Sequence, residues 1–163
     1  MIILALDSGL EKTGYAFFDK DVGLPQGYRY LTSGLVTTKK LETNEKRLKI
    51  LAYQVEKLIQ ENQPNKIILE QLFFFKNQKT VIAVAQAQGA IMLLAGQKNI
   101  PIVTLTPLQI KQIITGYGNA DKQSIQKMLT ILLPQIKKIT QDDEADAVAC
   151  GLAYCCLNEN LVK

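Results

Sequence analysis

The sequence contains no histidine. Without imidazole groups, the chain cannot build the nucleophile systems in which histidine activates serine or cysteine, and it cannot use histidine as a general acid or base. Zinc sites with histidine ligands are excluded for the same reason. Any hydrolytic chemistry must therefore depend on carboxylates, lysines and metal ions.

Cysteine is scarce as well: the chain has three, Cys150, Cys155 and Cys156, all near the C-terminus. Their number is odd and they show no paired spacing. They lie in an apolar stretch with helical character, which is typical of small core residues in a reducing compartment. We therefore predict that they pack in the core and have no metal or redox role.

Long hydrophobic runs are absent too. No apolar run approaches the roughly 20 residues that a membrane-spanning helix needs, and the N-terminus lacks the basic region of a secretory signal. The sequence therefore predicts a cytoplasmic protein without membrane contact. With 163 residues, 47% hydrophobic and 21% charged, it is predicted to form one domain over residues 1–163.

Negative charge is nearly missing from the middle of the chain. Residues 76–140 contain eight lysines and one acid, a net charge of +7, whereas residues 1–75 carry +1 and residues 141–163 carry −4. Such a basic segment favours a surface that binds a polyanion. The alternative is a scatter of solvated lysines without a common partner.

The first 14 residues contain the most informative stretch of the sequence. Residues 2–6 are all apolar, which predicts a strand buried on both faces in the middle of a sheet. Asp7 follows at once, and a buried carboxylate costs several kcal/mol unless a cation, a metal ion or a helix N-terminus neutralises it. Ser8 and Gly9 permit a tight turn against a ligand, although a plain hairpin turn is the alternative.

The rest of the chain predicts an α/β fold. Strands at 15–18 and 28–36, joined by short turns, indicate an antiparallel meander with the first strand. A helix over 43–62 followed by an apolar run at 67–69 indicates a right-handed crossover to a strand parallel to the first. Later patterns predict a helix over 78–98, a strand at 101–105 and three more helices near 106–116, 121–133 and 140–157. The predicted fold is a mixed five-stranded sheet, three antiparallel strands then parallel strands, with helices on both faces.

Three helix starts carry capping signals: Thr106 before a proline, Asp121, and Thr140 with Asp143 as a capping box. The helix over 78–98 is apolar on more than one side. It must therefore be buried on more than one side, either within the fold or against another subunit.

Carboxylates stand where two buried strands end, at Asp7 and Glu70, and the last helix begins with several more. Asp143 and Asp146 are three residues apart and share one face of that helix. If the helix packs beside both strands, these four carboxylates converge. Oxygen ligands alone favour Mg²⁺ or Mn²⁺, and two such ions can activate a water and stabilise the leaving oxygen of a phosphodiester.

The plain alternative is that acids in the first turn of a helix complement its dipole. That alternative accounts for Asp142 and Glu144. It does not account for Asp146, one turn further in, or for two core strands that also end in acids.

Several short segments, taken in order, carry a resemblance that spans nearly the whole chain. They are Asp7-Ser8-Gly9 with Thr13-Gly14, Glu70-Gln71-Leu72-Phe73 followed by Lys76-Asn77, Gln86-Ala87-Gln88-Gly89, Gln109-Ile110-Lys111-Gln112, Gly116-Tyr117-Gly118, Asp121-Lys122 and Asp143-Glu144-Ala145-Asp146-Ala147. Together they resemble the RuvC family of Holliday-junction resolvases, in the RNase H-like (retroviral integrase) superfamily.

The resemblance implies an RNase H-like fold, a site with two Mg²⁺ or Mn²⁺ ions at the four acids, and a homodimer that nicks two strands of a four-way junction. It also implies that Phe73 stacks on an unpaired base near the cut, an interaction worth about 1–3 kcal/mol per base. The candidate DNA-binding residues are Phe73, Phe74, Lys76, Lys79, Lys111 and Lys122. Of these, Lys111 and Lys122 match basic family positions near the site.

The sequence departs from the family pattern at Ser8, usually proline, at Gln88, usually arginine, and at Asp143, where relatives can have histidine. These departures leave sequence preference and strict junction selectivity open.

The alternatives are a relaxed nuclease of the same fold that cuts forks and flaps, and a junction-binding protein without catalysis. An actin-like ATPase or sugar kinase would need two such domains. Whether a helicase delivers the junction is also left open.

Overall fold

The computed structural model describes residues 1–21, 23–72, 78–136 and 139–157, and of residues 78–80 only the backbone. It contains one sheet with strand order β3-β2-β1-β4-β5. The elements in chain order are β1 (Ile2–Asp7), β2 (Lys12–Lys20), β3 (Tyr28–Thr37), α1 (Asn44–Asn62), β4 (Lys66–Glu70), α2 (Gln78–Gln97), β5 (Ile102–Leu105), α3 (Pro107–Thr115), α4 (Lys122–Leu132) and α5 (Asp142–Cys156).

The predicted mixed sheet is confirmed. β1, β2 and β3 form the antiparallel meander, and β4 and β5 run parallel to β1. The second and third strands extend further than the apolar pattern indicated, because backbone pairing continues past the buried positions to Lys12 and Lys20. In this register Asp7, at the end of β1, lies opposite Gly14 of β2.

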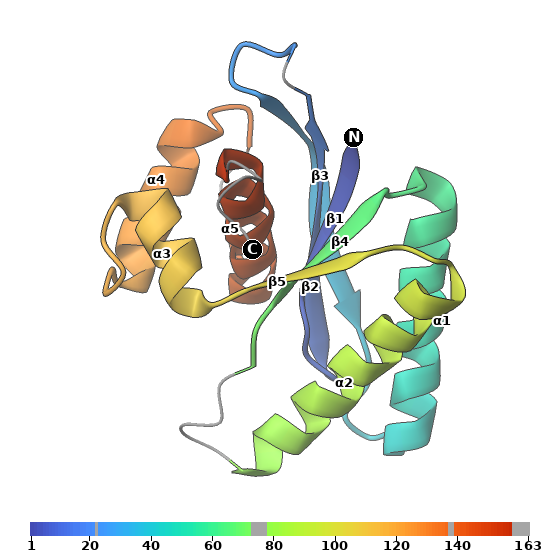
Figure 1. Cartoon of the computed structure of the whole chain (residues 1–163). Coiled ribbons are helices and arrows are strands. Elements are labelled where there is room, and N and C mark those ends of the chain that lie inside the picture. The colour runs from blue at the N-terminus through green and yellow to red at the C-terminus, as the bar shows by residue number, and fades with distance from the viewer. Residues whose placement is uncertain (22, 73–77, 137–138, 158–163) are drawn as a thin grey trace.

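The helices cover both faces of the sheet, α1 and α2 on one and α3, α4 and α5 on the other (Figure 1). Alternation along β1 assigns its side chains to the two sides: Leu4 and Leu6 pack toward α1 and α2, while Ile3 and Ala5 pack toward α5. All four side chains are fully buried. The apolar run that opens the chain is therefore the central strand, as predicted.

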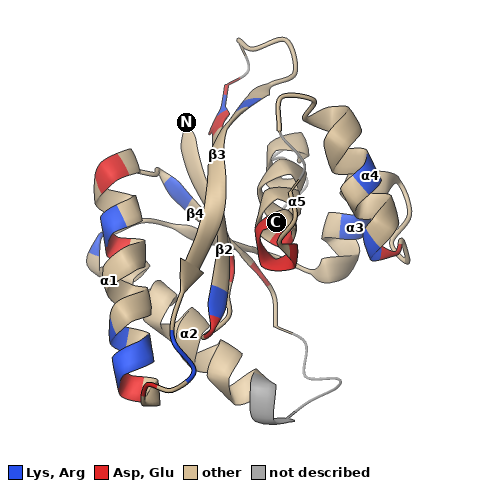
Figure 2. Cartoon of the chain, turned by 180° about the vertical axis from the view of Figure 1, so that it is seen from behind, with Lys and Arg blue, Asp and Glu red and all other residues tan. Residues whose placement is uncertain are grey.

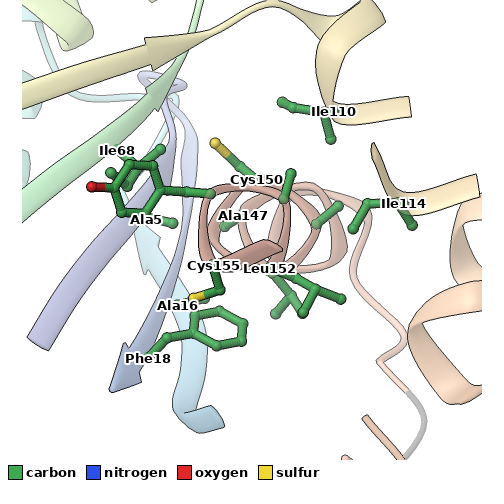
Figure 3. Packing of buried hydrophobic residues seen from close by; sticks show 14 of the residues in the cluster. Ala5, Ala16, Phe18, Ile68, Ile110, Ile114, Ala147, Cys150, Leu152 and Cys155 are labelled. Atoms are coloured by element: carbon green, nitrogen blue, oxygen red, sulfur yellow. The ribbon is translucent and has the colours of Figure 1, made fainter. Parts of the chain in front are cut away.

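Helix α5 lies directly on the sheet, between it and α3 (Figure 3). Two glycines permit this approach. A Cβ at Gly151 would stand 2.6 Å from the Phe18 ring and 3.0 Å from the Ala5 side chain, and a Cβ at Gly14 would overlap the backbone carbonyl of Asp143. The first turn of α5 therefore rests on β2 at the residue paired with Asp7.

Two of the three predicted caps are confirmed. Thr106 forms a reciprocal capping box with Gln109, and Asp121 accepts a hydrogen bond from the Ser124 backbone N–H (2.8 Å). The capping box predicted from Thr140 is wrong, because α5 begins after Gln141, whose side chain makes no cap hydrogen bond. Contacts with the sheet hold that helix start instead.

Of the three cysteines, Cys150 and Cys155 are buried in the core and Cys156 is exposed; none forms a disulfide. The prediction of small core residues therefore holds for two of them. None of the helices in the described ranges combines the length and apolar composition that a membrane span requires.

A substitution at Gly14 tests the packing of α5. Gly14→Ala should lower the free energy of unfolding by about 2 kcal/mol, because the added methyl group forces the helix start away from β2. Gly23→Ala is the matched control, since its Cβ would meet nothing closer than 3.4 Å. Urea unfolding of both variants checks this, and equal stability of the two would refute the close approach.

Candidate active site

Two carboxylates lie side by side at one edge of the sheet. Asp7 ends β1 and Glu70 ends β4, and these strands are adjacent and parallel. The carboxyl ends of neighbouring parallel strands meet at the same edge, so the fold places both acids there without help from any loop. Both side chains are partly buried.

Helix α5 brings the remaining two acids, Asp143 and Asp146, to the same edge. Besides the contact at Gly14, two side-chain bonds fix its first turn to the sheet. Ser33 Oγ of β3 donates to Glu144 Oε1 (2.6 Å), and Lys12 Nζ of β2 donates to Gln141 Oε1 (3.1 Å). The acids that the sequence placed on one helix face are thus held against the strand ends.

Burial and mutual repulsion disfavour the charged forms of these acids. Burial raises the pKa of Asp7 to about 7, and the charges of Asp146, Glu70 and Asp143 add to the shift. Burial also raises the pKa of Glu70 to about 7, with a further contribution from Asp146. The pKa of Asp146 is raised by burial, and Lys122 opposes that shift. The four carboxylates are therefore electrostatic neighbours, as the sequence predicted.

A lysine compensates part of this negative charge. Lys122, the first residue of α4, places Nζ 3.3 Å from Asp146 Oδ2 and 3.3 Å from Asp142 Oδ2. Burial lowers the pKa of Lys122, but the two carboxylates outweigh that effect and raise it. Lys111 of α3 likewise favours the charged form of a carboxylate, because it lowers the pKa of Glu70. Figure 2 shows acidic residues at the start of α5 and basic residues on α3 and α4 beside it.

Lys111 and Lys122 also line a hollow of about 310 Å³ together with Glu70 and Asp146. Its remaining walls are apolar side chains of α3, α4 and α5. The hollow therefore combines metal-ligand oxygens with two cations, an arrangement that suits a phosphate group next to a metal site.

The donor set fits a hard divalent cation, because all four side chains offer carboxylate oxygens. Across the described ranges, however, no three Asp, Glu, Cys or His side chains are grouped so that they could hold an ion as they stand. An ion shared by three of these carboxylates therefore requires side-chain rotation from the described positions.

The predicted DNA contacts divide into two groups. Lys111 and Lys122 lie at the site, as described above. Phe73, Phe74 and Lys76 lie outside the described residues, and so does the side chain of Lys79.

One residue that contacts the site, Gln88, was not predicted from the sequence. Gln88 of α2 donates from Nε2 to the backbone carbonyl of Glu70 (3.0 Å) and thereby ties the end of β4 to the helix. The sequence had marked Gln88 only as a departure from an arginine. Its spacing along α2 gave no sign of a contact with a strand 18 positions earlier.

Comparison with known proteins decides the family. The family model described as crossover junction endodeoxyribonuclease RuvC matches residues 3–154. The chain belongs to the RuvC family. A RuvC of Petrotoga mobilis is 40% identical over 154 residues, covering 94% of this chain and 93% of the relative. A RuvC of Fusobacterium nucleatum is also 40% identical over 154 residues, covering 94% of this chain and 80% of the relative.

Solved RuvC structures share the fold. Thermus thermophilus RuvC superposes with a TM-score of 0.85 at 23% identity, covering 96% of this chain and 94% of that one. The T. thermophilus RuvC in complex with a Holliday junction substrate gives a TM-score of 0.84 at 24% identity, covering 94% and 92%. The RNase H-like architecture expected from the RuvC resemblance is therefore confirmed.

The raised pKa values make a prediction about stability. In the unfolded chain Asp7 and Glu70 ionise near pH 4, whereas in the native protein they ionise near pH 7. Between these values the native state binds more protons, so the free energy of unfolding falls as pH rises from about 4 to 7. Asp7→Asn removes part of this penalty. We expect it to stabilise the protein by about 2 kcal/mol at pH 8 in EDTA, a rise of about 5 °C in Tm.

Thermal melts at pH 5 and pH 8 test this expectation, with Glu61→Gln as a control for loss of an exposed carboxylate. The gain from Asp7→Asn should be larger at pH 8 than at pH 5. An equal gain at both pH values, or a similar gain for the control, would contradict the electrostatic account.

Proposed function

We propose that this protein is a metal-dependent endonuclease that resolves Holliday junctions by paired, symmetric nicks, and that residues 1–163 form its single nuclease domain. The observation that carries the proposal is the set of four carboxylates, Asp7, Glu70, Asp143 and Asp146, held at one edge of the sheet by three separate elements. Membership of the crossover junction endodeoxyribonuclease family supports it. So does the fold shared with a RuvC solved on a Holliday junction.

In this proposal the four carboxylates hold two Mg²⁺ or Mn²⁺ ions. When bound, the ions supply Lewis-acid activation of a water and stabilise the leaving oxygen of the phosphodiester. The chain itself contributes the rigid strand ends that orient the ligands and the burial that makes their charges costly without a cation. Hydrolysis proceeds without a covalent enzyme intermediate, since the carboxylates serve as metal ligands.

Lys111 and Lys122 bind the phosphate in the hollow beside the acids. Their ammonium groups neutralise charge on the transferred phosphoryl group and steady the charge that develops during cleavage. Lys122 is already ion-paired with Asp142 and Asp146, so it links DNA binding to the position of one metal ligand. The residues proposed to contact the strand next to the cut are Phe73, Phe74, Lys76 and Lys79.

Cleavage of a labelled four-way junction tests the function. With Mg²⁺ or Mn²⁺, the wild-type protein should make paired nicks on the junction and leave duplex, flap and fork DNA uncut. Asp7→Asn and Asp146→Asn should each lower the single-turnover rate about a thousandfold, because each removes a ligand worth several kcal/mol of transition-state stabilisation. Both variants should still bind the junction.

Equal nicking of forks and flaps would replace this proposal with a general branched-DNA nuclease. If no substrate is cut with any divalent metal, the enzymatic role is wrong and a junction-binding protein remains.

We further propose that the protein acts as a homodimer through α2. One side of that helix packs into the core with Ala87, Ile91, Leu94 and Ala95. The other side is apolar and exposed: Ile82, Met92 and Leu93 are 62%, 52% and 63% exposed. Ala85, Gly89 and Gly96 lie on the same exposed side, and a Cβ at either glycine would have no neighbour within 4 Å. A second copy crossing this side would bury it, and a two-fold dimer matches a two-fold junction.

Leu93→Asp should convert the dimer to a monomer and abolish paired nicking, because a carboxylate at a tightly packed contact loses its hydration. Tyr53→Asp on α1 is the control, since Tyr53 is equally exposed (68%) but lies on another helix. Sedimentation velocity reads the mass of each variant. A Leu93→Asp protein that still sediments as a dimer would place the interface elsewhere.

A further inference from the structure

A second hollow, of about 520 Å³, borders the acidic edge. The turn after β1 and the start of β2 form one wall, with Gly9, Leu10, Glu11 and Lys12. Helices α1 and α2 form another, with Arg47, Ala83 and Val84. Asp143 of α5 completes the lining. The hollow thus shares a carboxylate with the proposed metal site, and its described lining includes neither Lys111 nor Lys122.

The two hollows lie on opposite sides of the acids. Glu70, Asp146 and the lysines of α3 and α4 belong to the first, on the sheet face that α5 covers. The second opens toward α1 and α2, which cover the other face. Asp7 ends β1, which lies between β4 and β2, so the acids lie between the two hollows.

Among the described residues that line this hollow, Lys12 and Arg47 match the charges of Glu11 and Asp143. Lys40 adds one positive charge beside it by pairing with Glu11, with 3.0 Å between Oε2 and Nζ. Lys12 is exposed, and its ammonium donates to the side-chain amide oxygen of Gln141. Because this amide is neutral, the contact does not neutralise the positive charge of Lys12. Figure 2 shows basic residues on β2 and at the nearby end of α1.

Arg47 is held in place at the wall of this hollow. Its Nε donates to Thr38 Oγ1 (3.0 Å), and that buried hydroxyl donates in turn to the backbone carbonyl of Leu10. The bond engages one edge of the guanidinium. A planar guanidinium fixed at one edge can offer its remaining N–H groups to a phosphate.

We propose that the second hollow binds the backbone of the cut DNA strand beyond the scissile phosphate, with Lys12 and Arg47 contacting one phosphate there. The strand then runs from Lys111 and Lys122, across the four carboxylates, to Lys12 and Arg47. Cations on both sides of the acids hold the strand across an edge that would otherwise repel it. This inference rests on the proposed nuclease function and extends it, because neither Lys12 nor Arg47 was among the predicted site residues.

The test pairs Lys12→Gln with a junction in which single phosphates of the cut strand are replaced by neutral methylphosphonates. Lys12 is chosen because its bond to Gln141 is exposed and a glutamine at position 12 keeps a side-chain N–H donor, whereas Arg47 holds the turn through the buried hydroxyl of Thr38. Lys57→Gln is the control: it removes the same charge from an exposed lysine near the other end of α1. Cleavage rates are measured in the presence of Mg²⁺, at protein concentrations that do not saturate the junction.

We expect Lys12→Gln to slow cleavage of the unmodified junction about fivefold and to reduce the salt dependence of binding by about one phosphate contact. One methylphosphonate position should slow the wild-type protein by a similar factor and leave Lys12→Gln unaffected. Lys57→Gln should behave as the wild type at every position.

If the effects of Lys12→Gln and of every methylphosphonate simply multiply, Lys12 contacts none of these phosphates and the inference is wrong. That outcome would leave the nuclease function intact, since the wild-type protein would still cut the unmodified junction. Failure of the wild-type protein to cut any junction would instead overturn the proposed function.

Discussion

Four carboxylates repel one another at one edge of the sheet, and the surrounding elements hold them there. Asp7 and Glu70 end central strands, where burial disfavours their charge, and α5 adds Asp143 and Asp146 to the same edge. A fold that needed only stability would place apolar or neutral groups there. Lysines near the acids, and the metal ions proposed above, would offset this cost.

The scaffold counters this repulsion with tight packing on both faces of the sheet. Leu4 and Leu6 are buried toward α1 and α2, and Ile3 and Ala5 toward α5, so the strand that carries Asp7 is fixed from both sides. Gly14 then lets the start of α5 touch β2. These apolar contacts lie within a few residues of the acids, and they keep the carboxylates close where their charges alone would separate them.

The surroundings of the edge are asymmetric. On the side of α3 and α4, Lys122 forms ion pairs with two acids, whereas on the side of α1 and α2 the cation Lys12 contacts a neutral amide. One side therefore compensates charge within the protein, and the other retains positive charge for an external anion. The exposed apolar side of α2 adds a separate surface, whose composition suits a protein partner better than water.

The α/β class, the order of the strands along the chain and the positions of the four acids proposed as metal ligands could be predicted from the sequence, because each depends on local pattern. An unbroken apolar run followed by Asp7 marks a central strand and its costly end, and a three-residue spacing places Asp143 and Asp146 on one face. Only the tertiary structure decided which residues meet across long separations. Lys12 and Gln141 are 129 positions apart, and Ser33 and Glu144 are 111 apart. The start of α5 depends on such contacts with the sheet and not on a cap at Thr140, and which side of α2 is exposed depends on how the helix packs. Local periodicity shows that a helix has apolar sides, but only the packed fold shows which of them its own core covers.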